Sequence, residues 1–123
     1  MWNETEKIYT GVKLSTSNLV FKRELPDGIS HELKPYESAK LLPDAKGFYW
    51  GFQENCQQLA LALLLDICHK PEVSLVYSNV FANDYVKWFP EEWKLESEFI
   101  ESWLEEKVLR KQNRTALEMV YEN

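Results

Sequence analysis

Apolar and polar residues alternate in the first part of the chain and recur at helical spacing in the rest. Residues 8–14 and 18–25 are rich in β-branched and aromatic side chains, and Ser15-Thr16-Ser17 between them favours a turn. Pro26-Asp27-Gly28 favours a second turn, because proline fixes one φ angle and glycine tolerates a positive one. A short third strand from Ile29 to Leu33 would follow. The pattern predicts an N-terminal antiparallel sheet, either a hairpin or three strands.

Helices are predicted after an irregular connection over residues 34–47 and an aromatic segment, residues 48–52, that forms either a last strand or a packed loop. Asn55 is the expected N-cap of the first helix, and Gln58 three residues later completes a capping box. This helix runs through Cys56 to Lys70 with leucines on every side, so we expect it to be central.

The next two helices each show one apolar face. Pro71 opens the second helix at a position where its missing N–H costs nothing. Ser74 and Ser78 lie off the expected buried stripe, which consists of Val73, Val76, Tyr77, Val80 and Phe81. A turn at Pro90 precedes the third helix, in which Leu95 and Ile100 form a candidate hydrophobic staple. Its expected buried face consists of Phe99, Ile100, Trp103 and Leu104.

These elements predict an α+β fold in which an N-terminal antiparallel sheet packs against a layer of about three helices. Residues 1–107 are expected to form a single globular domain. The tail, residues 108–123, begins with the basic stretch Arg110-Lys111-Gln112-Asn113-Arg114 and ends in a short apolar group. Three outcomes are open for the tail: it continues the helix, it frays, or it docks on a partner.

Composition narrows the class of protein. The chain has 123 residues, is 45% hydrophobic and contains five tryptophans, which is enough for a core without a metal or disulfide. A formal net charge of −6 repels a phosphate backbone, so nucleic acid is not an expected partner. The N-terminus lacks a signal-peptide pattern, and the longest apolar run, residues 59–65, is far shorter than the roughly 20 residues of a membrane span. A cytoplasmic location without membrane contact is expected.

Candidate chemistry is sparse. Cys56 and Cys68 lie about 18 Å apart on one predicted helix, too far for a disulfide, and two free thiols fit a reducing compartment. His31 and His69 show no metal-ligand spacing, so no metal site is expected. The cysteines lack a catalytic motif, and no phosphate-binding glycine loop is present, so no cofactor is expected. Whether the chain is an enzyme stays uncertain, with the residues favouring a non-enzyme.

Two aromatic segments stand out as candidate binding sites. Trp50, Gln53, Glu54 and Asn55 lie at the start of the central helix, where amides, a carboxylate and rings meet a helix N-terminus that can hold an anion. Trp88 and Trp93 flank Pro90 and are also candidate binding residues. The alternative for every one of these tryptophans is a place in the core.

Several motifs resemble a small domain family of unknown function that is bacterial and phage-associated. They are Tyr9-x-Gly11, Tyr49-Trp50-Gly51-Phe52, Gln58-Leu59-Ala60-Leu61-Ala62-Leu63-Leu64 with Asp66, Trp93-Lys94-Leu95, and Ile100 with Trp103-Leu104. Members of that family carry a glycine-rich loop before the leucine-rich helix. This chain has Gln53-Glu54-Asn55-Cys56 there, and Glu54 would repel a phosphate. The resemblance supports the fold and implies no activity.

The first functional hypothesis is a non-enzymatic, cytosolic protein-interaction module, which requires an exposed aromatic patch from Trp50, Trp88 or Trp93, or an apolar tail docked on another subunit. Its partner is another protein or a second copy of the chain. The alternative is a small-ligand-binding protein or minor enzyme with a pocket near residues 50–58. A third hypothesis is an acidic mimic of nucleic acid, against which the lysines interspersed on the last helix argue.

Overall fold

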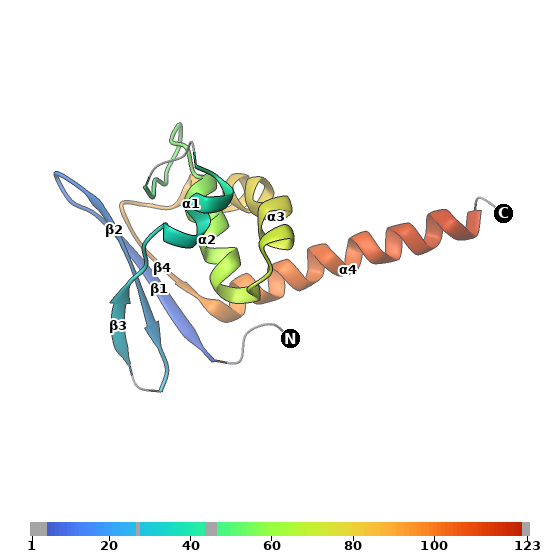
Figure 1. The fold of residues 1–123 in the computed structure, drawn as a ribbon, viewed down its shortest axis with the longest axis horizontal. Coiled ribbons are helices and arrows are strands. Elements are labelled where there is room, and N and C mark those ends of the chain that lie inside the picture. Colours follow the sequence, from blue (N-terminus) through green and yellow to red (C-terminus); the bar gives the residue numbers. More distant parts are fainter. Residues whose placement is uncertain (1–4, 27, 44–46, 122–123) are drawn as a thin grey trace.

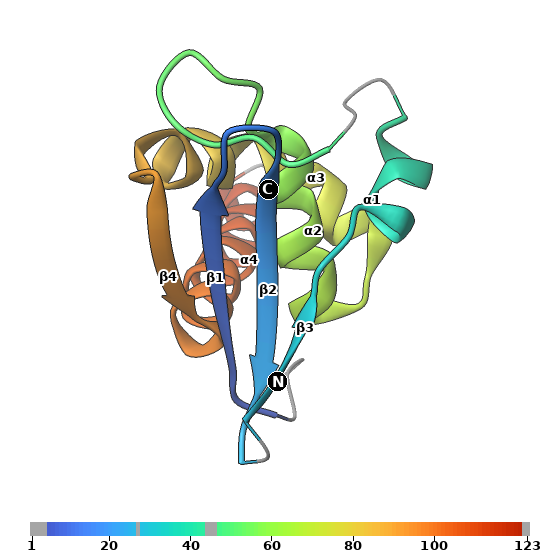
Figure 2. The same ribbon diagram turned by 90° about the vertical axis from the view of Figure 1, so that its left-hand side faces the viewer.

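The computed structural model describes residues 5–26, 28–43 and 47–121. Within these ranges the strands are β1 (Lys7–Lys13), β2 (Asn18–Glu24), β3 (Ile29–Glu32) and β4 (Glu92–Glu96). The helices are α1 (Tyr36–Leu41), α2 (Gln57–Cys68), α3 (Pro71–Asp84), the short 3₁₀ helix η1 (Val86–Trp88) and α4 (Ser97–Tyr121). The strands form one antiparallel sheet in the order β3-β2-β1-β4, and the helices gather on one of its faces (Figures 1 and 2). The predicted α+β fold is confirmed.

The strand β4 corrects the sequence analysis, which placed residues 92–96 before or within the last helix. Trp93 is buried while Glu92 and Lys94 on either side of it are exposed, which is the period-two pattern of a half-buried strand. β4 pairs with β1, and Trp93 lies directly opposite Gly11. Gly11 has no side chain, so the indole of Trp93 lies against its backbone, and this contact between distant segments is absent from any local pattern.

The helix α2 forms the centre of the core, as predicted. Leu59, Leu61, Leu63 and Leu64 are all fully buried. The predicted capping box is wrong, because the helix begins at Gln57 and Cys56 occupies the N-cap position without a side-chain hydrogen bond. Gln58 points inward and donates from Nε2 to the Leu42 carbonyl at 2.9 Å. Asn55 instead accepts from the Gln57 N–H at 3.3 Å, one residue away from the expected arrangement.

The buried face of α3 is also different from the prediction. Ser74 and Ser78 are buried, whereas Val76 and Val80 are exposed. The Ser74 hydroxyl lies 3.1 Å from the Cys68 thiol, and Ser78 accepts from Gln57 Nε2 at 3.0 Å while donating to the Leu75 carbonyl at 2.8 Å. Small side chains that find hydrogen-bond partners let α3 pack against α2, so polarity did not predict exposure here.

One further segment differs from the expectation, and another takes one of the two forms that were expected. The connection over residues 34–47, expected to be irregular, contains the short helix α1, and the aromatic segment Phe48–Phe52 is a packed loop rather than a strand. In α4, Ile100, Trp103 and Leu104 are buried as expected, but Phe99 is 41% exposed. The tail is the second half of α4, which runs to Tyr121 and extends away from the sheet and the other helices (Figure 1).

Candidate functional site

An open pocket of about 330 Å³ lies at the N-terminal end of α2. Five of its described lining residues carry side-chain amides, and its charged members are Glu54 and Lys87. We call it the amide pocket; its lining residues are Gln53, Glu54, Asn55, Cys56, Gln57, Asn79, Ala82, Asn83 and Lys87. It brings together the loop before α2, the last turns of α3 and η1. The predicted site residues Gln53, Glu54 and Asn55 therefore meet in one concave surface.

The loop before α2 is held in place at several points. Gly51 has a φ of 106°, and Gln53 adopts a φ of 71° that non-glycine residues rarely take. The Gly51 N–H donates to the Val86 carbonyl at 3.2 Å, which joins the loop to η1. Lys13 of β1 donates from Nζ to the Trp50 carbonyl at 2.9 Å. These bonds hold the backbone of the loop that carries Gln53 and Asn55 at the edge of the amide pocket.

Two exposed aromatic rings border this pocket. Phe52 and Trp88 are stacked, with ring centroids 5.8 Å apart and an interplanar angle of 29°, and each is 62% exposed. The Nζ of Lys87 lies 5.4 Å from the Phe52 ring and 5.2 Å from the Trp88 ring. Trp88 donates from Nε1 to the Asn83 carbonyl at 3.2 Å, which fixes the indole against the end of α3. We call Phe52, Lys87 and Trp88 the aromatic rim.

The other two candidate tryptophans belong to the core. Trp50 is 0% exposed and Trp93 is 6% exposed, and their rings meet edge to face at 5.8 Å. Phe89 packs on Trp93 with ring centroids 4.6 Å apart. Of the tryptophans expected as exposed anchors, Trp50 and Trp93 are therefore packing residues, while Trp88 is accessible to a partner. Sequence reasoning missed Phe52 and Lys87 as site residues. Their positions close to Trp50 and Trp88 in the sequence could have pointed to them.

Cys56 lies in the wall of the amide pocket, but its thiol is not prepared for nucleophilic chemistry. Sγ lies 3.5 Å from the Gly51 carbonyl and 3.4 Å from the Glu54 carbonyl. Burial raises the pKa of the Cys56 thiol above its ordinary value, and this effect outweighs the hydrogen bond to Gly51. Cys56 therefore stays a thiol at neutral pH. Because the thiolate is the reactive form, this cysteine is a poor nucleophile. Both Cys56 and Cys68 are buried and free.

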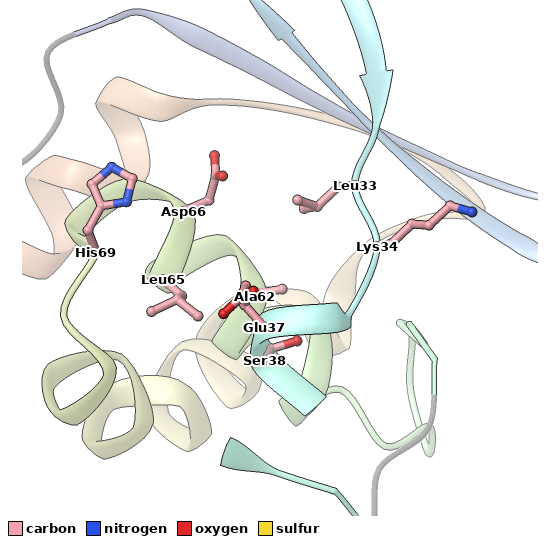
Figure 3. Close-up of a pocket in the computed structure, with 8 residues that line it drawn as sticks. All are labelled: Leu33, Lys34, Glu37, Ser38, Ala62, Leu65, Asp66 and His69. Carbon is pink, nitrogen blue, oxygen red and sulfur yellow. The ribbon is translucent and has the colours of Figure 1, made fainter. Parts of the chain in front are cut away.

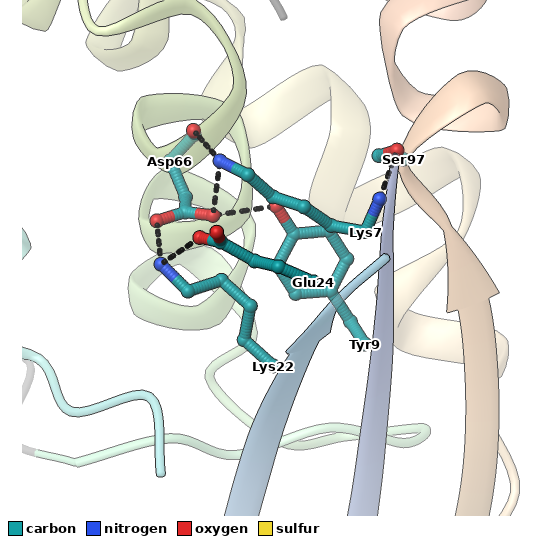
Figure 4. A network of polar contacts seen from close by, with 6 residues as sticks. All are labelled: Lys7, Tyr9, Lys22, Glu24, Asp66 and Ser97. Carbon is teal, nitrogen blue, oxygen red and sulfur yellow. Dashed lines mark hydrogen bonds and ion pairs between the residues drawn. The ribbon is translucent and has the colours of Figure 1, made fainter. Parts of the chain in front are cut away.

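A second polar cluster, the Asp66 network, connects α2 to the sheet (Figure 4). The Asp66 carboxylate accepts from the Tyr9 hydroxyl at 2.6 Å, from Lys22 Nζ at 2.9 Å and from Lys7 Nζ at 3.3 Å. Lys22 also lies 3.8 Å from a Glu24 carboxylate oxygen. Sequence reasoning did not identify this network. Tyr9 and Lys22 are direct cross-strand partners, and Lys7 is two residues from Tyr9 on the same face of β1, which is a signal that strand register could have supplied.

Charge and burial determine the protonation states in the Asp66 network. Burial alone would raise the pKa of Asp66, but the hydrogen bonds from Tyr9 and Lys22 and the charge of Lys7 leave that pKa below its ordinary value. Burial, reinforced by the neighbouring Asp66 charge, raises the pKa of Tyr9, which stays a donor. The carboxylate is ionised and engaged by its donors, so this arrangement holds the helix on the sheet and offers no general base.

Asp66 also borders a smaller pocket of about 160 Å³ between α1, α2 and the segment after β3 (Figure 3). Leu33, Ala62 and Leu65 contribute apolar surface, and His69 and Glu37 contribute polar groups. Among the described residues no group of three or more His, Cys, Asp or Glu side chains is arranged to hold a metal ion. In the same part of the chain no helix is long and apolar enough to cross a membrane.

Fold and site together define a small α+β domain with an open, amide-lined pocket bordered by exposed aromatic rings. A family model described as a family of unknown function, DUF6166, matches residues 9–106, and the chain belongs to this family. The matched range includes Tyr9, Asp66 and the whole amide pocket. No curated protein and no solved structure matches the chain.

Proposed function

We propose that this chain is a non-enzymatic interaction module that binds an extended segment of another protein in the amide pocket. An apolar side chain of that segment rests on the stacked rings of the aromatic rim. The observation that carries the proposal is the exposure of Phe52 and Trp88, two large stacked rings in contact with water beside a pocket. Tryptophan anchors next to concave surfaces dominate the energetics of protein interfaces.

The aromatic rim is held in one geometry before a partner arrives. The Trp88 indole is fixed by its hydrogen bond to the Asn83 carbonyl, and Lys87 lies across both rings. Rings that are already ordered lose little conformational freedom on binding, so more of the contact energy appears as affinity.

The amide pocket suits a peptide backbone. A side-chain amide offers both a donor and an acceptor, as the peptide group does, so Asn55, Asn79 and Asn83 can pair with main-chain N–H and C=O groups. Glu54 and Lys87 carry opposite charges, which makes the described pocket wall neutral overall. Neutral, amide-rich surroundings favour a main-chain ligand over a strongly charged one. The protonated Cys56 thiol supports binding rather than covalent catalysis.

We also propose that the module works in the cytoplasm. Its two cysteines are free thiols buried in the core, and a reducing compartment keeps such thiols unmodified.

A small polar ligand is the second candidate for the same pocket. The volume of about 330 Å³ falls at the lower end of the range for small-molecule sites, roughly 300–1,000 Å³. Such a ligand would be held by Asn55, Asn79 and Gln57 and would be insensitive to the loss of the Trp88 ring, because the ring lies at the border of the pocket.

A selection from a random peptide display library tests the proposal. We expect the selected peptides to share an apolar residue and to lose at least about tenfold in affinity for the Trp88→Ala and Phe52→Ala variants, as interface anchors do. Tyr36→Ala is the matched control, because Tyr36 is 69% exposed and carries Lys34 Nζ 5.9 Å over its ring on a different surface. Isothermal titration calorimetry measures each affinity.

The outcomes separate the two candidates. Peptides that bind the wild type and the Trp88→Ala variant equally well, or a selection that yields no binder, contradict the interaction module. Small polar compounds that shift the side-chain amide resonances of Asn55 and Asn79 in both proteins would favour the second candidate.

A further inference from the structure

The face of the sheet that points away from the helices is apolar along its centre. Tyr9 and Lys22 point toward α2, so the residues before and after them on β1 and β2 point outward. Figure 2 looks onto this outer face, and the described helices lie behind the sheet. The central outward side chains are half-buried, and they are Ile8, Thr10, Val12, Leu19 and Phe21. An antiparallel sheet covered on one side normally carries polar residues on its solvated side, so an apolar centre there is typical of a contact surface.

Opposite charges lie at the two edges of the outer face. The strand register places four outward residues in one row across the sheet: Lys94 on β4, Thr10 on β1, Phe21 on β2 and Glu32 on β3. Lys94 and Glu32 are both exposed. Three strand spacings put about 14 Å between them, so they do not pair within one chain. Glu32 lies 4.0 Å from Lys34 of its own chain, an exposed pair that contributes little.

The next row of the outer face also carries both signs of charge. Glu96 on β4 lies beside Ile8 on β1, and Arg23 lies beside Ile8 on β2. Both charged side chains are exposed. The outer face therefore has an apolar centre with charges of both signs around it, in an order that the strand register fixes.

We propose that two copies of this chain pair through their outer faces, about a two-fold axis that runs parallel to the strands between β1 and β2. This axis sets β4 of each copy over β3 of the other, so Lys94 of each copy faces Glu32 of the other. Phe21 of each copy lies over Thr10 of the other, where the smaller side chain leaves room for the ring. Packed sheets stand about 10 Å apart, a distance that side chains of this length span.

The charges favour this orientation over the other two-fold arrangement of the same faces. An axis perpendicular to the strands, through the row of Lys94 and Glu32, would set each of these residues against its own copy. It would also set Glu96 against Glu92. Like charges placed opposite each other weaken a contact. Either arrangement closes on itself at a dimer, but the axis parallel to the strands pairs opposite charges.

The size of the outer face indicates a weak dimer. Strands of seven residues in a four-stranded sheet give a face of roughly 19 Å by 23 Å. Roughly 400 Å² from each copy is close to the lower limit for a specific contact, so we expect a dissociation constant in the micromolar range. The lining described for the amide pocket contains none of the outer-face residues. The dimer and the binding of another protein therefore succeed or fail independently.

Charge reversal on the full chain tests both the dimer and its orientation. Lys94→Glu and Glu32→Lys each place two pairs of like charges in the contact, and we expect each variant to dimerise about tenfold more weakly than wild type. A chain with both substitutions has opposite charges in contact again and should dimerise like wild type. An equimolar mixture of the two single variants should do the same through heterodimers. Sedimentation equilibrium distinguishes the 14.6 kDa monomer from a dimer of twice that mass.

Matched variants separate the outer face from the rest of the surface. Lys40→Glu and Glu72→Lys make the same changes in net charge at exposed positions of α1 and α3, and both should dimerise like wild type. Phe21→Ala removes the central ring and should weaken the dimer by at least about tenfold. Phe52→Ala removes an exposed ring of the aromatic rim and should leave the dimer unchanged. Thermal denaturation checks that each variant remains folded.

Zero-length cross-linking of the wild-type chain tests the same contact without a substitution. A carbodiimide joins a lysine amine to a carboxylate when the two groups touch. Lys94 and Glu32 are about 14 Å apart within one chain, so an amide bond between them must join two chains. We expect mass spectrometry of the covalent dimer to identify this bond.

Several results would overturn the proposal. They are a wild-type chain that stays monomeric through the micromolar range, a dimer that both single reversals leave unchanged, and a doubly reversed chain that dimerises no better than the single variants. Covalent dimers joined only through residues of the helices would contradict it as well.

Discussion

Replacing Asp66 with asparagine should destabilise the fold by removing one charge from a buried ionic cluster. Asparagine has nearly the shape of aspartate, so packing is preserved, but the negative charge and one of the two acceptor oxygens that serve Tyr9, Lys7 and Lys22 are lost. Lys7 is the critical partner, because it is only 6% exposed and its Nζ would keep only neutral acceptors at residue 66, such as the backbone carbonyl at 3.1 Å. Removing one member of a buried pair costs about 3–5 kcal/mol, because the remaining charge is uncompensated.

Thermal and urea denaturation measure this loss. A cost of about 3–5 kcal/mol corresponds to a fall in melting temperature of roughly 10–20 °C for a domain of this size. Glu24→Gln is the matched control, since Glu24 is half exposed and lies 3.8 Å from Lys22; we expect a change below about 1 kcal/mol there. Adding Lys7→Met to Asp66→Asn should recover part of the stability, because it removes the unpaired buried charge. Equal effects of Asp66→Asn and Glu24→Gln would refute this reasoning.

The pH dependence of the unfolding free energy of wild type and of Asp66→Asn provides a second measurement. The pKa of Asp66 is lower in the folded chain than in the unfolded one, where it is near 3.9, so folding favours the ionised carboxylate. The stability that Asp66 contributes is therefore complete above about pH 5 and declines as the pH falls through the unfolded and then the folded pKa. We expect the stability difference between wild type and Asp66→Asn to shrink below about pH 4.

Three other predictions follow from the packing. Gly11→Ala should cost about 3 kcal/mol in unfolding experiments, because the new Cβ would overlap Nε1 and Cε2 of Trp93 and lie 2.7 Å from Cζ2. If the two residues are in contact, the double variant Gly11→Ala, Trp93→Leu should lose less stability than the sum of the two single losses. A loss equal to that sum would argue against the contact. Ser74→Val should destabilise by about 1–3 kcal/mol, since the larger side chain has no room beside Cys68, and a neutral result would contradict the close approach of α2 and α3. Cys56 should react with iodoacetamide far more slowly at neutral pH in the native chain than in urea, and equal rates would rule out a protected thiol.

Local patterns predicted the elements whose residues agree with their surroundings. The β1–β2 hairpin, the Ile29 strand and the leucine-rich α2 all appear near their expected positions. Where burial depends on contacts with another element, the local pattern was insufficient. Ser74 and Ser78 are buried because α2 approaches α3 closely and supplies hydrogen-bond partners. Hydrophobicity therefore placed Phe81 correctly in the core but assigned Val76 and Val80 to it wrongly. β4 forms because Gly11, far away in sequence, leaves room for Trp93.

The candidate site was predictable in part for the same reason. The position of Gln53, Glu54 and Asn55 at the start of a helix followed from capping preferences, although the cap itself is shifted by one residue. The division of the tryptophans into core and surface did not follow, since the burial of Trp50, Trp88 and Trp93 depends on rings from distant parts of the sequence. The hydrogen bond from Trp88 to the Asn83 carbonyl, and its stacking on Phe52, depend on how η1 folds against the end of α3.

The pairing of β1 with β4 has a consequence for how the protein is made. Ile8 lies opposite Glu96, so the sheet closes between residues separated by most of the chain. As the polypeptide leaves the ribosome, β1 and β2 can pair early, but the other edge of β1 has no partner until residue 96 has emerged. Exposed strand edges pair readily with other chains, and distant contacts form slowly. The interval between synthesis of β2 and of β4 is therefore the period in which nascent chains are most exposed to aggregation.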